Sequence, residues 1–291
     1  RQRVVSAPSA TPVGYRHVYL HVPFCARRCS YCDFAIAVRK HVPWRAFADS
    51  VDAELRLRRA ADSCDVLSTL YLGGGTPSRL GGEGVERLFE VLHRHIRLEA
   101  HAEVTLEANP EDVSTEAVAA WRRAGVNRVS LGVQSFNDRV LSWMHRVHDA
   151  DAALRAVETL RAGGIDALSL DLIFAAPDSL ERDWSDDLTR LLALAPDHIS
   201  LYGLTIEPHT PLGRWHARGE VEEAPEEVYE RQFLESHLRL QAAGFEHYEV
   251  ANFARPGCRA RHNSAYWQTV PYLGLGPSAH GFDGLERRWN Q

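Results

Sequence analysis

Three cysteines stand close together near the amino end of the chain, in the stretch YLHVPFCARRCSYCDF. Cys25, Cys29 and Cys32 have the spacing C-x3-C-x2-C. Three thiolates on one short loop can hold three irons of a four-iron, four-sulfur (4Fe-4S) cluster, which leaves the fourth iron open to an exchangeable small molecule. The spacing therefore predicts that these cysteines are metal ligands.

Two other interpretations of the three cysteines stay open. They could hold zinc, with His21 as the fourth ligand, or lie buried without a ligand, although structural zinc sites usually draw on two separated pairs of ligands. Arg27 and Arg28 within the loop could offset the charge of an anionic cluster. Cys64 and Cys258 are isolated, so the chain has no disulfide framework, which favours a reducing, cytoplasmic location.

Further polar residues follow other strand-like stretches. The turn YLGGGTPS, residues 71–78, exposes backbone amides that could approach the ammonium and carboxylate of an amino acid. Glu107 in TLEANP and Asp171 in SLDLIF suggest recognition of hydroxyl or ammonium groups, such as those of a ribose, although a lone acid could equally cap a helix. Arg146 could pair with a carboxylate through its fork of donors, or lie on a helix surface.

The stretch RHNSAYW near the carboxyl end combines His262 with Tyr266 and Trp267. An imidazole beside large aromatic rings is one way in which proteins hold a porphyrin. A histidine is more often structural, so the alternative is a hydrogen-bonded core residue.

Short apolar runs alternate with amphipathic stretches along the chain, which predicts an α/β fold with a parallel sheet, either doubly wound or barrel-like. Side chains at the carboxyl ends of parallel strands meet at one rim, and most of the residues above stand there. The predicted strands are residues 18–22, 68–74, 103–109, 128–134, 168–174 and 198–204. The predicted helices are residues 44–61, 84–96, 114–125, 151–164, 179–195 and 224–244.

The rhythm of strands and helices changes near residue 210. We predict a tail over residues 1–14, a barrel over 15–210 and an accessory region over 211–291, in a chain that looks like part of a longer polypeptide. A net charge of -6 among 291 residues argues against binding to nucleic acid. No apolar run approaches the length of a transmembrane segment.

The order of eight motifs resembles radical S-adenosylmethionine (SAM) proteins of the oxygen-independent coproporphyrinogen oxidase family, and among them the heme-chaperone subgroup. The motifs are YLHVPFCARRCSYCDF, YLGGGTPS, TLEANP, NRVSLGVQSF, DLIF, SLYGLTIEP, YEVANFA and RHNSAYW. The resemblance implies a partial (βα)6 barrel with a smaller carboxy-terminal accessory region. It also implies a 4Fe-4S cluster on Cys25, Cys29 and Cys32, with SAM bound to the open iron through its amine and carboxylate.

The same resemblance assigns residues to the SAM site. Tyr19 and the backbone at Tyr31 would line the cofactor pocket. The methionine end would contact Gly74, Gly75 and Thr76. Further cofactor-binding positions match Glu107, Gln134, Arg146 and Asp171.

Two departures from the family pattern concern function. The catalytic oxidases carry a further cysteine where this chain has Phe34, and a long amino-terminal arm where only 18 residues precede Tyr19 here. A third departure does not point the same way: DLIFAAPDSL replaces a loop that usually contains glycine, which leaves the loop after Asp171 in question but not Asp171 itself. The resemblance therefore favours a chaperone that binds heme, at His262, and passes it to an acceptor protein, with an electron donor for the cluster. The alternative is an enzyme that oxidises coproporphyrinogen III with a SAM-derived radical.

Overall fold

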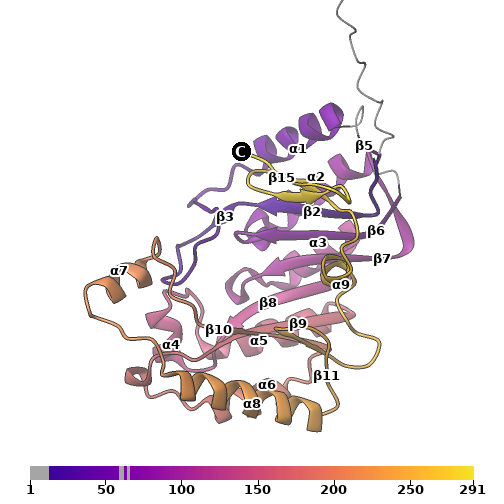
Figure 1. The fold of residues 1–291 in the computed structure, drawn as a ribbon. Helices are drawn as coiled ribbons and strands as arrows, with labels where there is room; N and C mark the ends of the chain where they lie inside the picture. The colour runs from indigo at the N-terminus through magenta and orange to yellow at the C-terminus, as the bar shows by residue number, and fades with distance from the viewer. Residues whose placement is uncertain (1–12, 59–61, 64–65) are drawn as a thin grey trace, which may run out of the picture.

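The computed structural model describes residues 13–58, 62–63 and 66–291. Most of the predicted tail and Cys64 lie outside these residues. All six predicted strands are present and pair in parallel, in the order β10-β9-β8-β7-β6-β2 (Figure 1). Each strand therefore lies beside the next one along the chain. This order is that of a partial barrel, since a doubly wound sheet reverses direction part-way. The strands are β2 (His17–Val22), β6 (Val66–Gly74), β7 (Arg97–Ala108), β8 (Arg128–Gln134), β9 (Ala167–Phe174) and β10 (His198–Gly203).

Helices cover the outer face of this sheet, where valine and leucine side chains of the strands are buried against them. Each fully buried side chain of this kind stabilises the fold by roughly 1.5–3 kcal/mol. The helices are α1 (Trp44–Arg58), α2 (Gly81–His93), α3 (Thr115–Ala124), α4 (Asp138–Trp143), α5 (Ala150–Ala162), α6 (Trp184–Ala193), α7 (Pro211–Ala217), α8 (Glu226–Ala242) and α9 (Arg261–Trp267). Three short 3-10 helices are η1 (Pro77–Leu80), η2 (Pro110–Asp112) and η3 (Asp178–Leu180).

The helix boundaries follow from local capping. Ser114 accepts a hydrogen bond from the backbone N–H of Ala117 at the start of α3, and Asp149 does the same for Ala152 at the start of α5. Helix α3 ends at Gly125, whose φ of 106° is in the left-handed region. Polar caps and a terminal glycine of this kind satisfy backbone groups that the helix leaves free.

The inner face of the barrel is polar. On β8, for example, Val129, Leu131 and Val133 are buried outside, whereas Arg128 and Ser130 face inward. The neighbouring strands follow the same alternation, because successive side chains of a strand point to opposite faces. The barrel therefore encloses polar space rather than a second apolar core.

Residues after 211 extend the same sheet at both edges. The edge strand β10 pairs with β12 (Asn252–Ala254), which pairs with β11 (Glu246–His247), both antiparallel. The opposite edge strand, β2, pairs in parallel with β13 (Leu273–Leu275). Helix α9 lies between β12 and β13 in the chain and contacts β6. The division at residue 210 stays a prediction. The remaining short strands are β1 (Val13–Gly14), β3 (Phe24–Cys25), β4 (Ala37–Val38), β5 (Asp62–Ser63), β14 (His280–Phe282) and β15 (Arg287–Trp289).

Candidate functional site

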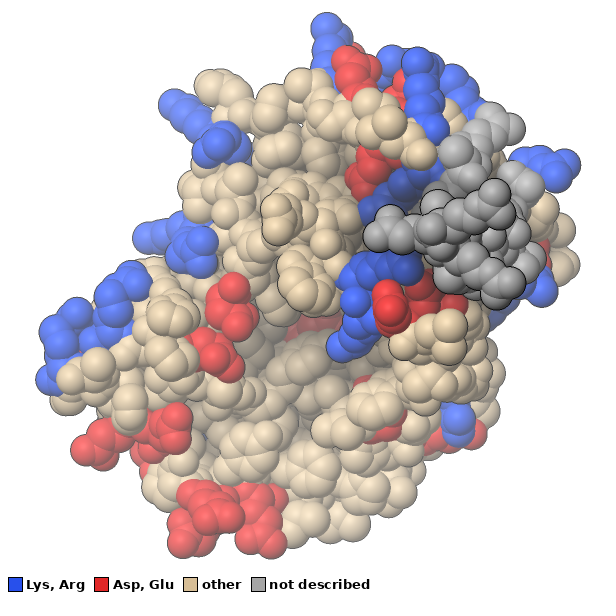
Figure 2. All heavy atoms as spheres, turned by 45° about the horizontal axis from the view of Figure 1, so that its top comes forward, with Lys and Arg blue, Asp and Glu red and all other residues tan. Residues whose placement is uncertain are grey.

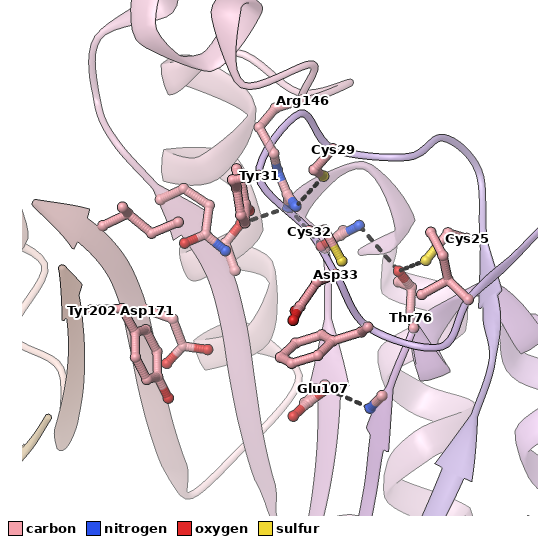
Figure 3. Close-up of a pocket in the computed structure, with 18 of the residues that line it drawn as sticks. Cys25, Cys29, Tyr31, Cys32, Asp33, Thr76, Glu107, Arg146, Asp171 and Tyr202 are labelled. Atoms are coloured by element: carbon pink, nitrogen blue, oxygen red, sulfur yellow. Dashed lines mark hydrogen bonds between the residues drawn. The ribbon is translucent and has the colours of Figure 1, made fainter. Parts of the chain in front are cut away.

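The three cysteines line one pocket of about 400 Å³, here called the cysteine pocket. Cys25 ends the short strand β3, which pairs with β4, and the backbone N–H of Cys32 donates to the carbonyl of Cys29 at 3.4 Å. Cys25 is buried, and Cys29 and Cys32 are half-buried. Figure 3 shows the three sulfurs on the loop at one side of this pocket.

Two side chains from distant elements contact the sulfurs. Nη1 of Arg146 lies 3.4 Å from Sγ of Cys29, and Oγ1 of Thr76 lies 3.5 Å from Sγ of Cys25 (Figure 3). Burial raises the pKa of the Cys25 thiol and raises that of Cys32 to about 11. A thiol of this kind stays protonated by itself and becomes a thiolate when a metal binds it.

A zinc site finds no support in the arrangement. His21, the predicted fourth ligand, lies 3.1 Å from the Tyr19 hydroxyl through Nδ1 and 2.9 Å from the carbonyl of Ala35 through Nε2. Among the described residues, no three histidine, cysteine or acidic side chains are close enough to hold a single ion. The donor set suits a larger group, in which each sulfur holds a separate iron.

Arg146 is held in place by more than the sulfur. Its Nη2 donates to Oδ1 of Asn109 at 2.6 Å and to the carbonyl of Gly132 at 2.9 Å. The loop arginines are placed differently, since Arg28 donates to the carbonyl of Cys32 at 3.2 Å. The cation in hydrogen-bond contact with a cysteine sulfur therefore comes from the turn after α4, while the charge of Arg28 acts to lower the pKa of Cys25 and of Cys32.

Two half-buried carboxylates stand in the same pocket. Glu107 accepts from the Tyr71 hydroxyl at 2.7 Å and from the backbone N–H of Gly74 at 3.0 Å. Asp171 accepts from the hydroxyls of Ser130 at 2.8 Å and Ser169 at 3.2 Å. Burial raises the pKa of Glu107 to about 7 and also raises that of Asp171. Asp171 was expected at the end of its strand but lies within β9, deeper in the barrel.

The glycine turn after β6 is needed by the protein itself. Gly74 has a φ of 109°, and a Cβ atom there would lie 2.5 Å from the His21 ring. A Cβ atom on Gly75 would lie 2.6 Å from the backbone of Pro23. Close packing against the strand β2 and its loop therefore requires glycine here, whether or not a ligand approaches.

Gln134 reaches the pocket through an unusual backbone conformation. Its φ is 67°, and the register between β8 and β9 shifts between Gly132 and Gln134. A buried ion pair supports the following turn, because Asp187 accepts from Arg182, from the Ser135 hydroxyl at 2.8 Å and from the N–H of Phe136 at 2.9 Å. Such local strain persists where the surroundings fix it.

The structure brings most of the predicted site residues together. Tyr19 and His262 are the exceptions, since both line a second, deeper cavity instead. Tyr19 stacks on Tyr71 at a ring distance of 6.1 Å. Those that line the cysteine pocket are Cys25, Cys29, Tyr31, Cys32, Gly74, Gly75, Thr76, Glu107, Gln134, Arg146 and Asp171.

His262 occupies a packed position on α9. Its side chain is buried, and its ring nitrogens lie 2.6 Å from Oγ1 of Thr69 and 2.8 Å from the Tyr266 hydroxyl. Burial lowers the pKa of the imidazole to about 3, so the ring is neutral. In this conformation neither nitrogen is open to an iron, and the role of His262 as a heme contact stays a prediction.

Several residues of the site were missed from the sequence. Asn109 orients Arg146, Tyr71 donates to Glu107, and Ser130 donates to Asp171. Tyr202 lines the pocket opposite the cysteines (Figure 3). The period-two pattern of the strands carries the signal, since every second residue of RVSLGVQ faces inward and is polar or glycine.

Comparison with known proteins places this site in a family. Residues 19–191 match the radical SAM superfamily. The chain is 40% identical to the heme chaperone HemW of Mycobacterium tuberculosis, across 100% of this chain and 76% of that protein. It is 36% identical to the heme chaperone HemW of Escherichia coli, across 91% of this chain and 69% of that protein.

The chain belongs to the HemW family of radical SAM proteins. The family predicted from the sequence motifs is therefore confirmed. A mouse protein, the mitochondrial radical S-adenosyl methionine domain-containing protein 1, is 36% identical across 91% of this chain and 60% of its own length.

The fold is also confirmed by a solved structure. Coproporphyrinogen III oxidase (HemN) from Escherichia coli superposes with a TM-score of 0.81, over 94% of this chain and 66% of that one. At 24% identity this likeness concerns the fold alone. No helix of the described residues is long and apolar enough to cross a membrane.

Proposed function

We propose that this HemW-family chain is a heme-binding chaperone that carries a 4Fe-4S cluster and SAM, and passes heme to an acceptor protein. The central observation is the cysteine pocket, where three sulfurs converge and Phe34 stands at the position of a further cysteine. Phe34 lines this pocket with 63% of its surface exposed. The relatives at 32–40% identity that are named heme chaperones supply the second support.

In this proposal Cys25, Cys29 and Cys32 hold the cluster, which when bound supplies electrons and one open iron. Thr76 and Arg146 contact two of the sulfurs and would favour their anionic form through charge-assisted hydrogen bonds. The backbone of the loop fixes the spacing of the ligands.

The rest of the pocket would hold SAM. The turn at Gly74, Gly75 and Thr76 stands beside the sulfurs, where the amino acid end of the cofactor would lie. Glu107 and Asp171 supply half-buried acceptors, and Gln134 and the backbone at Tyr31 complete the lining. A pocket of about 400 Å³ is within the usual range for a small-molecule site.

Heme is proposed to bind near α9. Trp267, at the end of this helix, is 58% exposed and offers an apolar surface. The hydroxyl of Tyr266, by contrast, is hydrogen-bonded to Nε2 of His262. Coordination by His262 would require the Tyr266 hydroxyl to leave its ring nitrogen.

The partners follow from this chemistry. The cluster needs an electron donor, and the bound heme needs an acceptor protein. The face in Figure 2 carries Lys and Arg along its left and upper edges and acidic side chains at its lower left. Neither sign of charge covers this face, so we propose no binding to nucleic acid. The free cysteines of the described residues support a reducing compartment, and we propose the cytoplasm.

The decisive experiment separates the chaperone from the enzyme. The anaerobically reconstituted chain is incubated with coproporphyrinogen III, a reductant and SAM, and in parallel with heme. We expect a shifted Soret band with heme and no protoporphyrinogen from coproporphyrinogen III. Steady formation of protoporphyrinogen would replace our proposal with the oxidase alternative.

A further inference from the structure

The polar interior of the barrel contains a second cavity of about 220 Å³, here called the inner cavity. It lies between α9 and the inward faces of the strands. Four of its lining residues, Glu107, Ser130, Asp171 and Tyr202, also line the cysteine pocket. The inner cavity is therefore the deeper neighbour of the proposed cofactor site.

Arg128 is the notable residue of this cavity. Only 4% of its surface is exposed, and it faces inward from the start of β8. Within the described parts of the chain, its guanidinium has no hydrogen bond, ion pair or aromatic ring as a partner. Arg146 and Arg182, which also line or support the site, are each held by several acceptors.

The charge of Arg128 acts on Asp171 in the same cavity, but neither Asp171 nor Glu107 forms an ion pair with Arg128 among the described residues. Asp171 accepts hydrogen bonds from serines, and Glu107 accepts them from Tyr71 and Gly74. A buried cation without a paired anion is costly, by several kcal/mol in general. The arrangement therefore favours the arrival of an anionic group.

A second polar atom in the same cavity is also unmatched. Oδ1 of Asn252, which is itself buried, has no hydrogen-bond partner among the described residues. The amide of Asn263 reaches the cavity from α9, with a long contact of 3.5 Å to the Tyr248 hydroxyl. The cavity thus offers a cation, amide groups and tyrosine hydroxyls beside the carboxyls of Glu107 and Asp171. The unmatched Oδ1 is an acceptor, so it needs a donor such as water and does not itself bind a carboxylate oxygen.

We propose that the inner cavity binds a carboxylate group, with Arg128 as its anchor. The guanidinium fork matches the two oxygens of a carboxylate, and burial strengthens the pairing. The volume is below that of most drug-sized ligand sites, so it admits a small acid or one acidic arm of a larger molecule. The carboxylate can come from a free small acid or from the propionate arm of a porphyrin, and only the second source rests on the proposed heme function.

The first test uses free acids and does not depend on heme. Thermal unfolding of the reconstituted chain is followed with increasing propionate or acetate, against chloride at constant ionic strength and pH. We expect saturable stabilisation by the carboxylates. Arg128→Met should weaken this binding by tenfold or more, because it removes a charged hydrogen bond. Arg128→Lys should retain part of it, and Arg155→Met, on the exposed surface of α5, should behave like the wild type.

The second test identifies the source. Heme is compared with its dimethyl ester, in which both propionates are blocked. If the wild type binds heme more tightly than the ester, and this difference disappears in Arg128→Met, the site is assigned to a porphyrin propionate. Equal binding of both, together with stabilisation by free acids, assigns it to a small acid.

The proposal is overturned if free carboxylates do not stabilise the wild type and if the wild type binds heme and its dimethyl ester equally well, since the cavity would then hold only water. That outcome is measured on the wild type alone, so it does not depend on whether a variant folds. Equal responses in the wild type and in a folded Arg128→Met would likewise remove Arg128 from the site.

Discussion

Nη1 of Arg146 lies 3.4 Å from Sγ of Cys29, although 117 positions separate the two residues in the chain. The same guanidinium donates to Asn109 and to the carbonyl of Gly132. These three contacts fix a positive charge at the edge of the proposed cluster site.

Arg146 is expected to tune the electron affinity of the cluster. Arg146→Gln removes a cation that favours the more negative, reduced state, so the reduction potential should fall while iron content is retained. Redox titration with spectroscopic detection measures this. The control is Arg39→Gln, which changes an exposed arginine after β4 that donates a hydrogen bond to the backbone carbonyl of Val38. An unchanged potential in Arg146→Gln would show that its charge does not reach the iron.

Loss of one cysteine of the pocket should remove the cluster. In Cys29→Ser one iron loses its thiolate, and we expect loss of the brown colour and of most iron after anaerobic reconstitution, against about four irons per wild-type chain. Cys258→Ser should load normally. Stoichiometric zinc in freshly purified wild type that reconstitution does not displace would contradict the cluster.

Asp171 is expected to contribute to SAM binding. Asp171→Ala removes a half-buried charged acceptor and should weaken binding by about 1.5–3 kcal/mol, with iron content unchanged. Calorimetric titration of the reconstituted protein gives this difference. Asp151→Ala, on the exposed start of α5, supplies the matched control, and equal affinities for SAM in all three proteins would place the cofactor elsewhere.

Glu107 should make stability depend on pH. Its folded pKa of about 7 exceeds its ordinary value of 4.5, so the folded state holds the proton more tightly. The resulting stabilisation is full below about pH 4.5 and is lost as the pH rises to 7. At pH 8 the free energy of unfolding of Glu107→Gln should therefore exceed that of the wild type by up to about 3 kcal/mol, and this gap should narrow at pH 5.

Urea unfolding of the chain without cofactors at the two pH values measures this gap. Glu158→Gln, on an exposed position of α5, should show no such change. A gap of the same size at pH 5 and pH 8 would mean that the titration of Glu107 is not coupled to folding.

The role of His262 can be separated from packing with two variants. If its imidazole holds heme iron, His262→Ala should abolish the Soret shift, whereas Tyr266→Phe should keep it because the competing hydroxyl is gone. Absorbance of the iron–sulfur cluster should persist in both. Normal heme spectra in both variants, with lower stability of His262→Ala, would assign His262 to packing alone.

The sequence predicted what depends on local spacing. The cysteine loop and the six strands follow from residues that are neighbours in the chain. The contact between Arg146 and Cys29 could not be predicted, because it depends on how two distant loops approach. The sequence left Arg146 open between pairing with a ligand carboxylate and lying on a helix surface. In the structure its Nη1 lies beside a sulfur, and its role in binding SAM stays a prediction.

Two further differences have local physical reasons. The glycine-poor loop after Asp171 was the weakest part of the family match. Ala175 there adopts a φ of 58°, a conformation that glycine takes without strain, and its N–H donates to Gln232 at 2.7 Å. Arg128 lies two positions before Ser130 in a predicted strand, so the alternation of side chains along the strand places both inside the barrel.

The pairing of β2 with β13 has a consequence for how the protein folds during its synthesis. Val18 lies beside Leu273, so the strand that leads into the cysteine loop receives its outer neighbour from near the end of the described chain. At ordinary rates of translation the interval between the synthesis of β2 and that of β13 is on the order of tens of seconds, and the outer edge of β2 stays unpaired for that time. The loop proposed to bind iron therefore follows the strand whose outer edge is paired last, and we expect iron to reach the finished site only after residues 273–275 have been made.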